Sequence, residues 1–181
     1  MIKGFTFDTS ALISLGHTNL IQNIIENFEV NISKRIVEEL KDIAQHHSED
    51  EDAKAAKKWL RKIDQLILHE TTERDAGEDE LFDLCKKNKM FLVSDDIKAI
   101  RKFRREIHCY YSVHIVYILN QKGFITREHA IASLERMRHQ REWRNNVLSA
   151  TAISLFKTEI SIAGLRLTPS SGISILDILF I

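Results

Sequence analysis

Acidic side chains follow two apolar segments of the chain that are typical of short β-strands. Asp8 comes directly after the segment Ile2–Phe7. Asp95 and Asp96 follow Met90–Val93 after a single serine. The carboxyl ends of neighbouring parallel strands form the ligand-binding edge of an open α/β sheet. We therefore expect these carboxylates to lie close together.

Two glutamates extend this acidic set. Glu39 lies in a helical segment after the second predicted strand, and Glu80 lies in the first turn of another predicted helix. Carboxylates in one pocket repel one another, and each is driven to take up a proton unless a cation neutralises it. Hard oxygen ligands select Mg²⁺ or Mn²⁺. An ion held in this way can polarise a phosphate and activate a water molecule.

Each of these acids also has a simpler interpretation. An Asp that follows a strand is commonly the N-cap of the next helix. Glu39 or Glu80 alone would be an ordinary acid on a helix surface. Only the joint pattern of Asp8, Glu39, Glu80 and Asp95 favours a metal site over these structural roles.

The elements that must position the acids alternate between strand-like and helical patterns. The chain has one proline and six glycines, so few residues interrupt its helices. Alternation of strands and helices predicts an α/β fold, with a central parallel sheet covered on both faces. The predicted strands are Ile2–Phe7, Phe28–Ile32, Gln65–His69, Met90–Val93 and Cys109–Ser112, and the main predicted helices are Ser10–Leu15, Lys34–Ala44, Ser48–Asp64, Glu78–Lys87, Asp95–Arg105, Val113–Gln121 and Thr126–Arg138.

Composition excludes several classes of protein. The chain has 181 residues, of which 44% are hydrophobic, so it can bury a core of ordinary size. The 26 basic residues balance the 26 acidic ones, and a nucleic-acid-binding role must therefore rest on local clusters of charge. Cys85 and Cys109 are too few for a disulfide scaffold and lack the spacing of a metal site. The N-terminus does not resemble a signal peptide and no segment has the length of a membrane span, so we expect a cytoplasmic protein.

Other catalytic patterns are missing from the sequence. The histidines have no companion ligands at zinc spacing. Ser10 and Ser14 lack the setting of a hydrolase nucleophile, and the chain has no glycine-rich phosphate loop. An aspartyl-nucleophile phosphatase would need a second Asp two residues after Asp8, where Ser10 stands.

Clustered basic residues are candidates for contact with a nucleic-acid backbone. One cluster follows the predicted acidic edge directly and includes Lys98, Arg101, Lys102, Arg104 and Arg105. A second cluster occupies residues 136–144 and is further from the acids in sequence. Charge runs on helices are commonly solvated surface, but a nuclease needs cations near its acidic pocket to hold phosphates. We therefore favour the first cluster as a substrate-binding element.

At the acidic positions the sequence resembles the PIN-domain family, in particular its prokaryotic branch of toxin-like ribonucleases. The resemblance covers roughly residues 2–138 and includes a segment, 112–126, similar to the helix and turn that follow in this branch. Four motifs carry it, in the order and spacing of the family: F-D-T-S-A-L-I-S-L (Phe7–Leu15), I-V-E-E-L (Ile36–Leu40), G-E-D-E-L-F-D-L-C (Gly77–Cys85) and F-L-V-S-D-D-I-K-A-I-R (Phe91–Arg101).

The resemblance implies a three-layer α/β/α fold and metal-dependent cleavage of RNA. It places the acidic cluster on Asp8, Glu39, Glu80 and Asp95, which would hold Mg²⁺ or Mn²⁺, with Asp96 as the alternative to its neighbour. Ser10 matches the hydroxyl that supports the first Asp, and Ser94 stands where Thr is commoner. The resemblance further suggests the toxin of a toxin–antitoxin pair, inhibited by a partner protein. The alternative is a PIN-like module that binds RNA or protein without catalysis.

Two parts of the chain depart from the family pattern. The acid-rich segment Ser48–Asp64 interrupts the region between the second and third motifs, and no resemblance extends beyond Arg138. We therefore predict a nuclease domain over residues 1–141 and a C-terminal apolar extension over 142–181. An exposed apolar extension would form a larger patch than monomers usually tolerate. We expect it to pack against a second subunit in a homodimer, and the alternative is that it completes its own domain.

Overall fold

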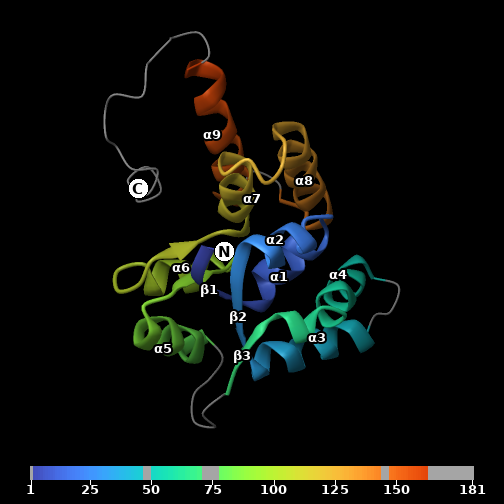
Figure 1. The fold of residues 1–181 in the computed structure, drawn as a ribbon, viewed down its shortest axis with the longest axis vertical. Coiled ribbons are helices and arrows are strands. Elements are labelled where there is room, and N and C mark those ends of the chain that lie inside the picture. The colour runs from blue at the N-terminus through green and yellow to red at the C-terminus, as the bar shows by residue number, and fades with distance from the viewer. Residues whose placement is uncertain (1, 47–49, 71–77, 144–146, 163–181) are drawn as a thin grey trace.

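The computed structural model describes residues 2–46, 50–70, 78–143 and 147–162 (Figure 1). Its centre is a five-stranded sheet in which every paired strand is parallel to its neighbour. The strand order is β3-β2-β1-β4-β5. The strands are β1 (Ile2–Phe7), β2 (Phe28–Ser33), β3 (Ile67–His69), β4 (Phe91–Val93) and β5 (Cys109–Tyr110).

Helices connect the strands and cover both faces of the sheet. The chain moves from β1 toward β3 and then returns to β4 and β5 on the other side of β1. Because such crossovers are right-handed, this reversal puts α5 and α6 on the face opposite α1 and α2. The helices are α1 (Thr9–Gly16), α2 (Ile21–Asn27), α3 (Lys34–His46), α4 (Glu51–Leu60), α5 (Glu78–Asn88), α6 (Ile97–Phe103), α7 (Ser112–Gln121), α8 (Arg127–Gln140) and α9 (Val147–Ile162), with a short 3₁₀ turn at Ile63–Gln65.

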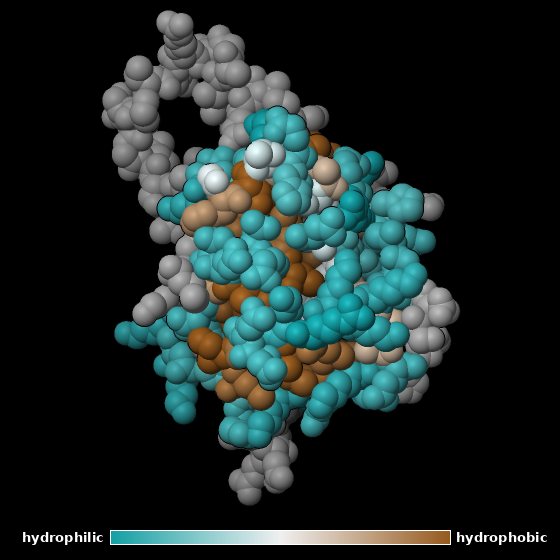
Figure 2. All heavy atoms as spheres, turned by 45° about the vertical axis from the view of Figure 1, so that its right-hand side comes forward, coloured by the Kyte–Doolittle hydropathy of each residue, from teal (hydrophilic) through white to brown (hydrophobic). Residues whose placement is uncertain are grey.

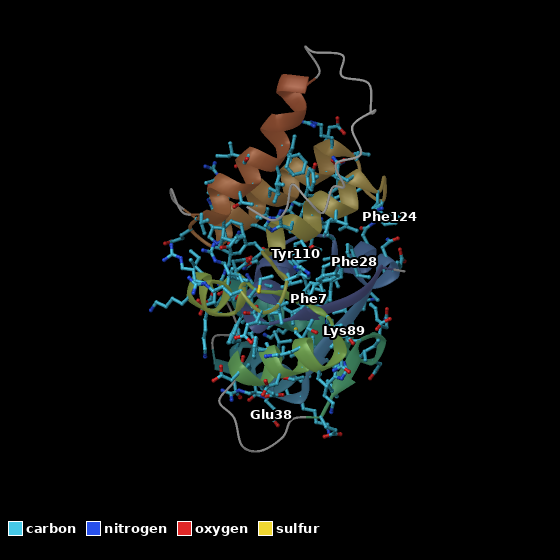
Figure 3. The ribbon with its side chains drawn as sticks, turned by 90° about the vertical axis from the view of Figure 1, so that its left-hand side faces the viewer. Phe7, Phe28, Glu38, Lys89, Tyr110 and Phe124 are labelled. Carbon is cyan, nitrogen blue, oxygen red and sulfur yellow. The ribbon has the colours of Figure 1, made fainter. Side chains whose placement is uncertain are left out.

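The strand β1 lies at the middle of the sheet and fixes the position of the first acid. Phe5 pairs with Val30 of β2 on one side and with Phe91 of β4 on the other. Phe7 is fully buried, and Figure 3 shows it in the interior with Phe28. Asp8, which comes next in the chain, donates its backbone N–H to the carbonyl of Val93 at 3.0 Å. The ends of β1 and β4 are thereby held together.

The three-layer α/β/α fold predicted from the sequence is confirmed. The predicted strands are present, although β3 and β5 are shorter than predicted, with bounds Ile67–His69 and Cys109–Tyr110. The helix predicted over the acid-rich segment Ser48–Asp64 is α4, and its first turn contains Glu51 and Asp52.

The C-terminal region contains a helix that the sequence analysis did not predict. This helix, α9, packs against α7, and its residues Leu148 and Phe156 are buried in the same core as the sheet. The remainder of the predicted extension, residues 163–181, lies outside the described residues. No helix in the described part of the chain is long and apolar enough to cross a membrane.

Candidate active site

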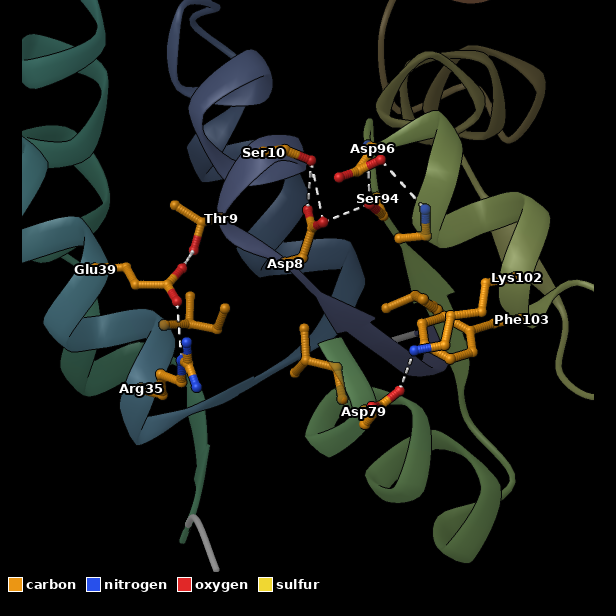
Figure 4. A pocket seen from close by; sticks show the side chains of 14 residues that line it. Asp8, Thr9, Ser10, Arg35, Glu39, Asp79, Ser94, Asp96, Lys102 and Phe103 are labelled. Atoms are coloured by element: carbon orange, nitrogen blue, oxygen red, sulfur yellow. Dashed lines mark hydrogen bonds and ion pairs between the residues drawn. The ribbon is translucent and has the colours of Figure 1, made fainter. Parts of the chain in front are cut away.

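A pocket of about 550 Å³ opens at the carboxyl ends of β1 and β4 (Figure 4). This is the edge at which the sequence predicts a site, and the topology explains why. The chain leaves β1 for β2 on one side and reaches β4 on the other, so the connections diverge here and leave a crevice. The lining residues are Asp8, Thr9, Ser10, Arg35, Ile36, Glu39, Asp79, Leu81, Leu92, Ser94, Asp96, Ala99, Lys102 and Phe103.

Asp8 lies at the base of this pocket and is held by several donors. Its carboxylate accepts hydrogen bonds from the hydroxyl of Ser10 at 2.8 Å, from the amide of Ala11 at 2.8 Å and from the hydroxyl of Ser94. Asp8 therefore caps helix α1, as its alternative interpretation predicts, and also faces the pocket. Burial raises the pKa of Asp8 to about 7 despite these hydrogen bonds, and the nearby charge of Asp95 adds to the rise. A cation beside Asp8 would therefore stabilise its charged form.

Glu39 stands across the pocket from Asp8, on helix α3. One carboxylate oxygen accepts a hydrogen bond from the hydroxyl of Thr9 at 2.5 Å, and the other is 3.1 Å from Nε of Arg35. Arg35 and Glu39 are four residues apart, so they share one face of the helix. Glu39 thus has a cation partner within its own helix.

Glu80 lies close to Glu39 but does not line the pocket. Burial raises the pKa of Glu80, a hydrogen bond from Ser33 and the charge of Arg35 lower it, and the charge of Glu39 raises it. The same helix presents Asp79 to the pocket instead. Asp79 is ion-paired with Nζ of Lys102 at 2.5 Å.

The adjacent acids Asp95 and Asp96 have different surroundings. Both oxygens of Asp95 are taken by Ser112, whose amide donates at 2.9 Å and whose hydroxyl donates at 2.7 Å. Asp96 instead lines the pocket and caps α6, accepting hydrogen bonds from the amides of Lys98 at 2.7 Å and Ala99 at 3.2 Å. Burial raises the pKa of Asp95. Asp96 therefore lines the pocket with Asp8, while Asp95 lies close enough to Asp8 for their charges to interact but does not line the pocket.

The predicted metal ligands fit a hard cation in kind. Asp8, Glu39 and Asp96 supply carboxylate oxygens to one pocket, and burial raises the pKa of Asp8. The positions of these carboxylates, however, do not match those of a metal site. Within the described ranges, no group of three or more His, Cys, Asp or Glu side chains is placed so that it could hold one ion. Glu39 is bonded instead to Thr9 and Arg35.

The serines and basic residues predicted to contact substrate divide into two groups. Ser10 and Ser94 line the pocket and donate to Asp8. The predicted basic residues Lys98, Arg101, Arg104 and Arg105 are exposed on or beside α6 and do not line it.

The sequence analysis missed three polar residues of the pocket wall. Arg35, Thr9 and Asp79 are each next to, or one helical turn from, a predicted acid. That spacing was the signal available in the sequence. Lys102, from the predicted basic cluster, also lines the pocket.

The chain belongs to the PIN-domain family. Residues 5–158 match the sequence profile of the DUF3368 family, which is described as a PIN domain. This match includes α9 as far as Thr158, beyond the region where the sequence motifs show a resemblance. PIN domains are generally nucleases.

Solved structures and curated proteins add little to this assignment. The chain is similar to a domain of a functionally unknown protein from Methanocaldococcus jannaschii DSM 2661, with 19% sequence identity and a TM-score of 0.44. That similarity covers 61% of this chain and 91% of the other. No curated protein matches the chain.

Proposed function

We propose that this protein is a metal-dependent endoribonuclease that hydrolyses RNA phosphodiesters with Mg²⁺ or Mn²⁺. The observation that supports this proposal best is the placement of Asp8, Glu39 and Asp96 in one pocket at the carboxyl ends of β1 and β4. Membership of a family whose members are generally nucleases supports it independently.

The chain's own residues would prepare the pocket for the cation and the phosphate. Asp8, Glu39 and Asp96 would hold the ion, and Glu80 lies close enough for the charge of Glu39 to raise its pKa. When bound, the cation would lower the pKa of a water molecule and offset negative charge on the phosphate. Ser10 and Ser94 hold the carboxylate of Asp8 in place. Arg35 and Lys102 put positive charge on the pocket wall, where phosphate oxygens can bind.

The test is to titrate Mn²⁺ into the purified protein and to measure the unfolding temperature of the protein at each concentration. A ligand that binds only the folded state raises this temperature by mass action. We expect the rise in the wild type, and we expect its loss in Asp8→Asn, Glu39→Gln and Asp96→Asn. Asp95→Asn is the matched control, because Asp95 is bonded to Ser112 and does not line the pocket. If Asp95→Asn abolished the rise and Asp96→Asn did not, the ligand assignment would be reversed.

Cleavage is measured on the same variants with a labelled RNA. We expect Mn²⁺-dependent fragments from the wild type and from Asp95→Asn, and none from Asp8→Asn. A wild type that binds RNA but produces no fragments with either cation would contradict the enzyme proposal.

A second candidate function is a non-catalytic module that binds RNA or protein. One observation favours it: the pocket carboxylates of Glu39 and Asp79 are already paired with Arg35 and Lys102. In that case Mn²⁺ would leave the unfolding temperature unchanged, and Asp8→Asn would not alter RNA binding.

The resemblance to toxin-like ribonucleases supports a further proposal about the role of the protein in the cell. We propose that the protein acts on cytoplasmic RNA as a toxin that an antitoxin protein inhibits. Expression of the wild type should then arrest growth, and expression of Asp8→Asn at the same level should not. Equal growth of the two cultures would leave the nuclease proposal intact and contradict the toxin role.

A further inference from the structure

Helices α8 and α9 enclose an apolar groove of about 210 Å³ that shares no lining residue with the acidic pocket. Ile131 of α8 and Ile153 of α9 line it, and these side chains are 41% and 47% exposed. The buried rings of Trp143 and Phe156 line it as well. Single exposed apolar side chains are ordinary on a protein surface. Several that share a groove with aromatic rings are typical of a binding surface.

The charged residues of this groove all come from α8. They are Arg127, Glu135 and Arg138. Glu135 is paired with Arg138 at 2.9 Å, and Nη2 of Arg127 donates to the carbonyl of Phe156 at 2.9 Å. Two arginines and one glutamate give the α8 side of the groove a net positive charge. A ligand that fits this groove is therefore apolar and carries an acid.

The chain itself contains a segment with this chemistry. Every residue of 173–181 is apolar except Ser174 and Asp177, and Asp177 is the one charged residue among them. The residues before this segment, 168–172, are Thr, Pro, Ser, Ser and Gly, a composition typical of turns and linkers. The segment follows the described part of the chain, which ends at Ile162.

The direction of α9 favours the groove of another copy over the groove of the same copy. The residues of α9 that line the groove lie within Ser149–Phe156, whereas the helix continues to Ile162. Figures 1 and 3 both show the end of α9 projecting beyond α7 and α8. The helix rises about 14 Å between Ile153 and Ile162, so the chain leaves it at a distance from its own groove. Residues 163–172 can span at most about 36 Å, which is enough to reach a neighbouring molecule.

We propose that the groove between α8 and α9 binds residues 173–181 of a second copy of the chain, and that reciprocal exchange forms a twofold dimer. Exchange of an identical segment between copies is a low-cost route to a dimer. The apolar side chains of the segment cover Ile131 and Ile153, and Asp177 lies on the positively charged α8 side. This inference is independent of the nuclease proposal, and it names both surfaces of the homodimer predicted from the sequence.

The test measures the mass of the full chain by light scattering over a range of concentrations. We expect the wild type to be a dimer. Ile153→Glu puts a charge into the apolar contact and should weaken dimerisation about 30-fold or more, as should Leu176→Asp in the segment. Ile131→Glu tests the opposite wall of the groove and should have the same effect. The unfolding temperature of each variant shows whether its fold is intact.

Leu68→Glu is the matched control for the added charge. Leu68 is 46% exposed, close to the exposure of Ile153, and it lies on β3 outside the groove. We expect this variant to dimerise like the wild type. Asp177→Lys should weaken the dimer, because it brings a positive charge to a positive surface, and Asp177→Glu should not.

A mixing experiment separates exchange between copies from docking within one copy. Ile153→Glu retains an intact segment, and Leu176→Asp retains an intact groove. If the segment binds a second copy, a mixture of the two variants should contain heterodimers held by one intact contact, at concentrations where each variant alone is a monomer. Docking within one copy predicts no heterodimers.

Three results would overturn the proposal. The first is a dimer that Ile153→Glu and Leu176→Asp leave as tight as the wild type. The second is an equal loss of dimer in Leu68→Glu. The third is a wild type that stays monomeric, and in that case a common fall in the unfolding temperature of Ile153→Glu and Leu176→Asp would assign the groove to the segment of its own copy.

Discussion

Two neighbouring aspartates show how side-chain surroundings decide chemistry at the scale of a residue. Asp95 and Asp96 follow the same strand, and nothing in their sequence distinguishes them. The distinction comes from Ser112, which is 17 residues away from Asp95 and satisfies both of its oxygens. Asp96 is left to face the pocket while it caps α6. The sequence does not identify Ser112 as this partner, because Ser112 meets Asp95 only when β5 pairs with β4.

The pH dependence of stability tests the environment of Asp8. In the absence of divalent cations, we expect Asp8→Asn to be more stable than the wild type at about pH 8 and equal to it at about pH 4. The folded pKa is raised from 3.8 to about 7. Between these values folding takes up a proton, so the stability of the wild type falls relative to the variant as pH rises. Thermal unfolding across this range measures the difference.

The asparagine keeps the cap and removes the charge. Its side-chain oxygen can still accept from the amide of Ala11, as Asp8 does at 2.8 Å. Identical pH profiles for the two proteins would mean that Asp8 titrates normally in the fold. A loss of stability at every pH would show that the Asp8 carboxylate stabilises the fold, through hydrogen bonds such as those from Ser10 and Ser94, instead of destabilising it by its charge.

At the scale of elements, much of the fold follows from local patterns. Short apolar runs such as Phe91–Val93 and the acidic first turn of α4 identify their elements without tertiary information. The strand order does not, because β1 pairs with both β2 and β4, and no local pattern says which strand becomes central. The acids Asp8 and Glu39 could be predicted from their places in the sequence. Asp8 follows a strand directly, and Glu39 lies in the helix that follows the next strand. The pairing of Glu39 with Arg35 could not, since it depends on side-chain conformation.

The contact between α1 and α4 depends on a glycine. A Cβ atom built on Gly16 would lie 2.8 Å from Cβ of Ala55 and 2.9 Å from its carbonyl oxygen. Nearby, Nε1 of Trp59 donates to the carbonyl of Leu12 at 2.6 Å, so the two helices cannot separate freely. We expect Gly16→Ala to reduce the free energy of unfolding by about 1–3 kcal/mol, measured by denaturant titration.

A second substitution identifies steric crowding as the cause. Ala55→Gly removes one of the two crowded Cβ atoms and costs about 1 kcal/mol by itself as a glycine within a helix. The double variant should lose less stability than the sum of the single losses, although the backbone of Ala55 stays close. Strictly additive losses would show that crowding between these helices is not the reason why Gly16→Ala is less stable.

Asp52 joins three helices near their ends. Its two oxygens lie 2.8 Å from Nε2 of His17 and 2.5 Å from Nη1 of Arg141, which follow α1 and α8. The hydrogen bond with His17 and the charge of Arg141 lower the pKa of Asp52. We expect Asp52→Asn to lower the unfolding temperature near neutral pH. The deficit should shrink as pH falls below 3.8, because wild-type Asp52 then becomes protonated as well.

Glu51→Gln is the comparison for this substitution. Glu51 is the preceding residue of α4, and it is half exposed and paired with Lys54. A surface pair of this kind contributes little to stability. An equal effect of the two substitutions would show that the link through Asp52 adds nothing to the fold.

At the scale of the whole molecule, the C-terminal helices form a layer that continues beyond the sheet. Helix α9 packs on α7, and Nη2 of Arg127 in α8 donates to the carbonyl of Phe156 at 2.9 Å. A groove of about 210 Å³ runs between α8 and α9, with the exposed apolar side chains Ile131 and Ile153 on its walls. Figure 2 shows apolar atoms reaching the surface between polar ones in this half of the molecule. A homodimer formed by the apolar extension remains a prediction.

Removal of residues 163–181 tests that prediction without removing core side chains. A truncation after Asn146 would delete Leu148 and Phe156, which are buried, so the cut must follow Ile162. We expect the truncated chain to keep its unfolding temperature within about 3 °C, a shift that corresponds to about 1 kcal/mol for a chain of this size. We also expect it to keep its response to Mn²⁺, and light scattering should report a monomer where the full chain gives a dimer. A truncated chain that still dimerises would place the interface elsewhere. One that unfolds would show that the fold needs residues 163–181, either in the core of their own domain or through the dimer itself.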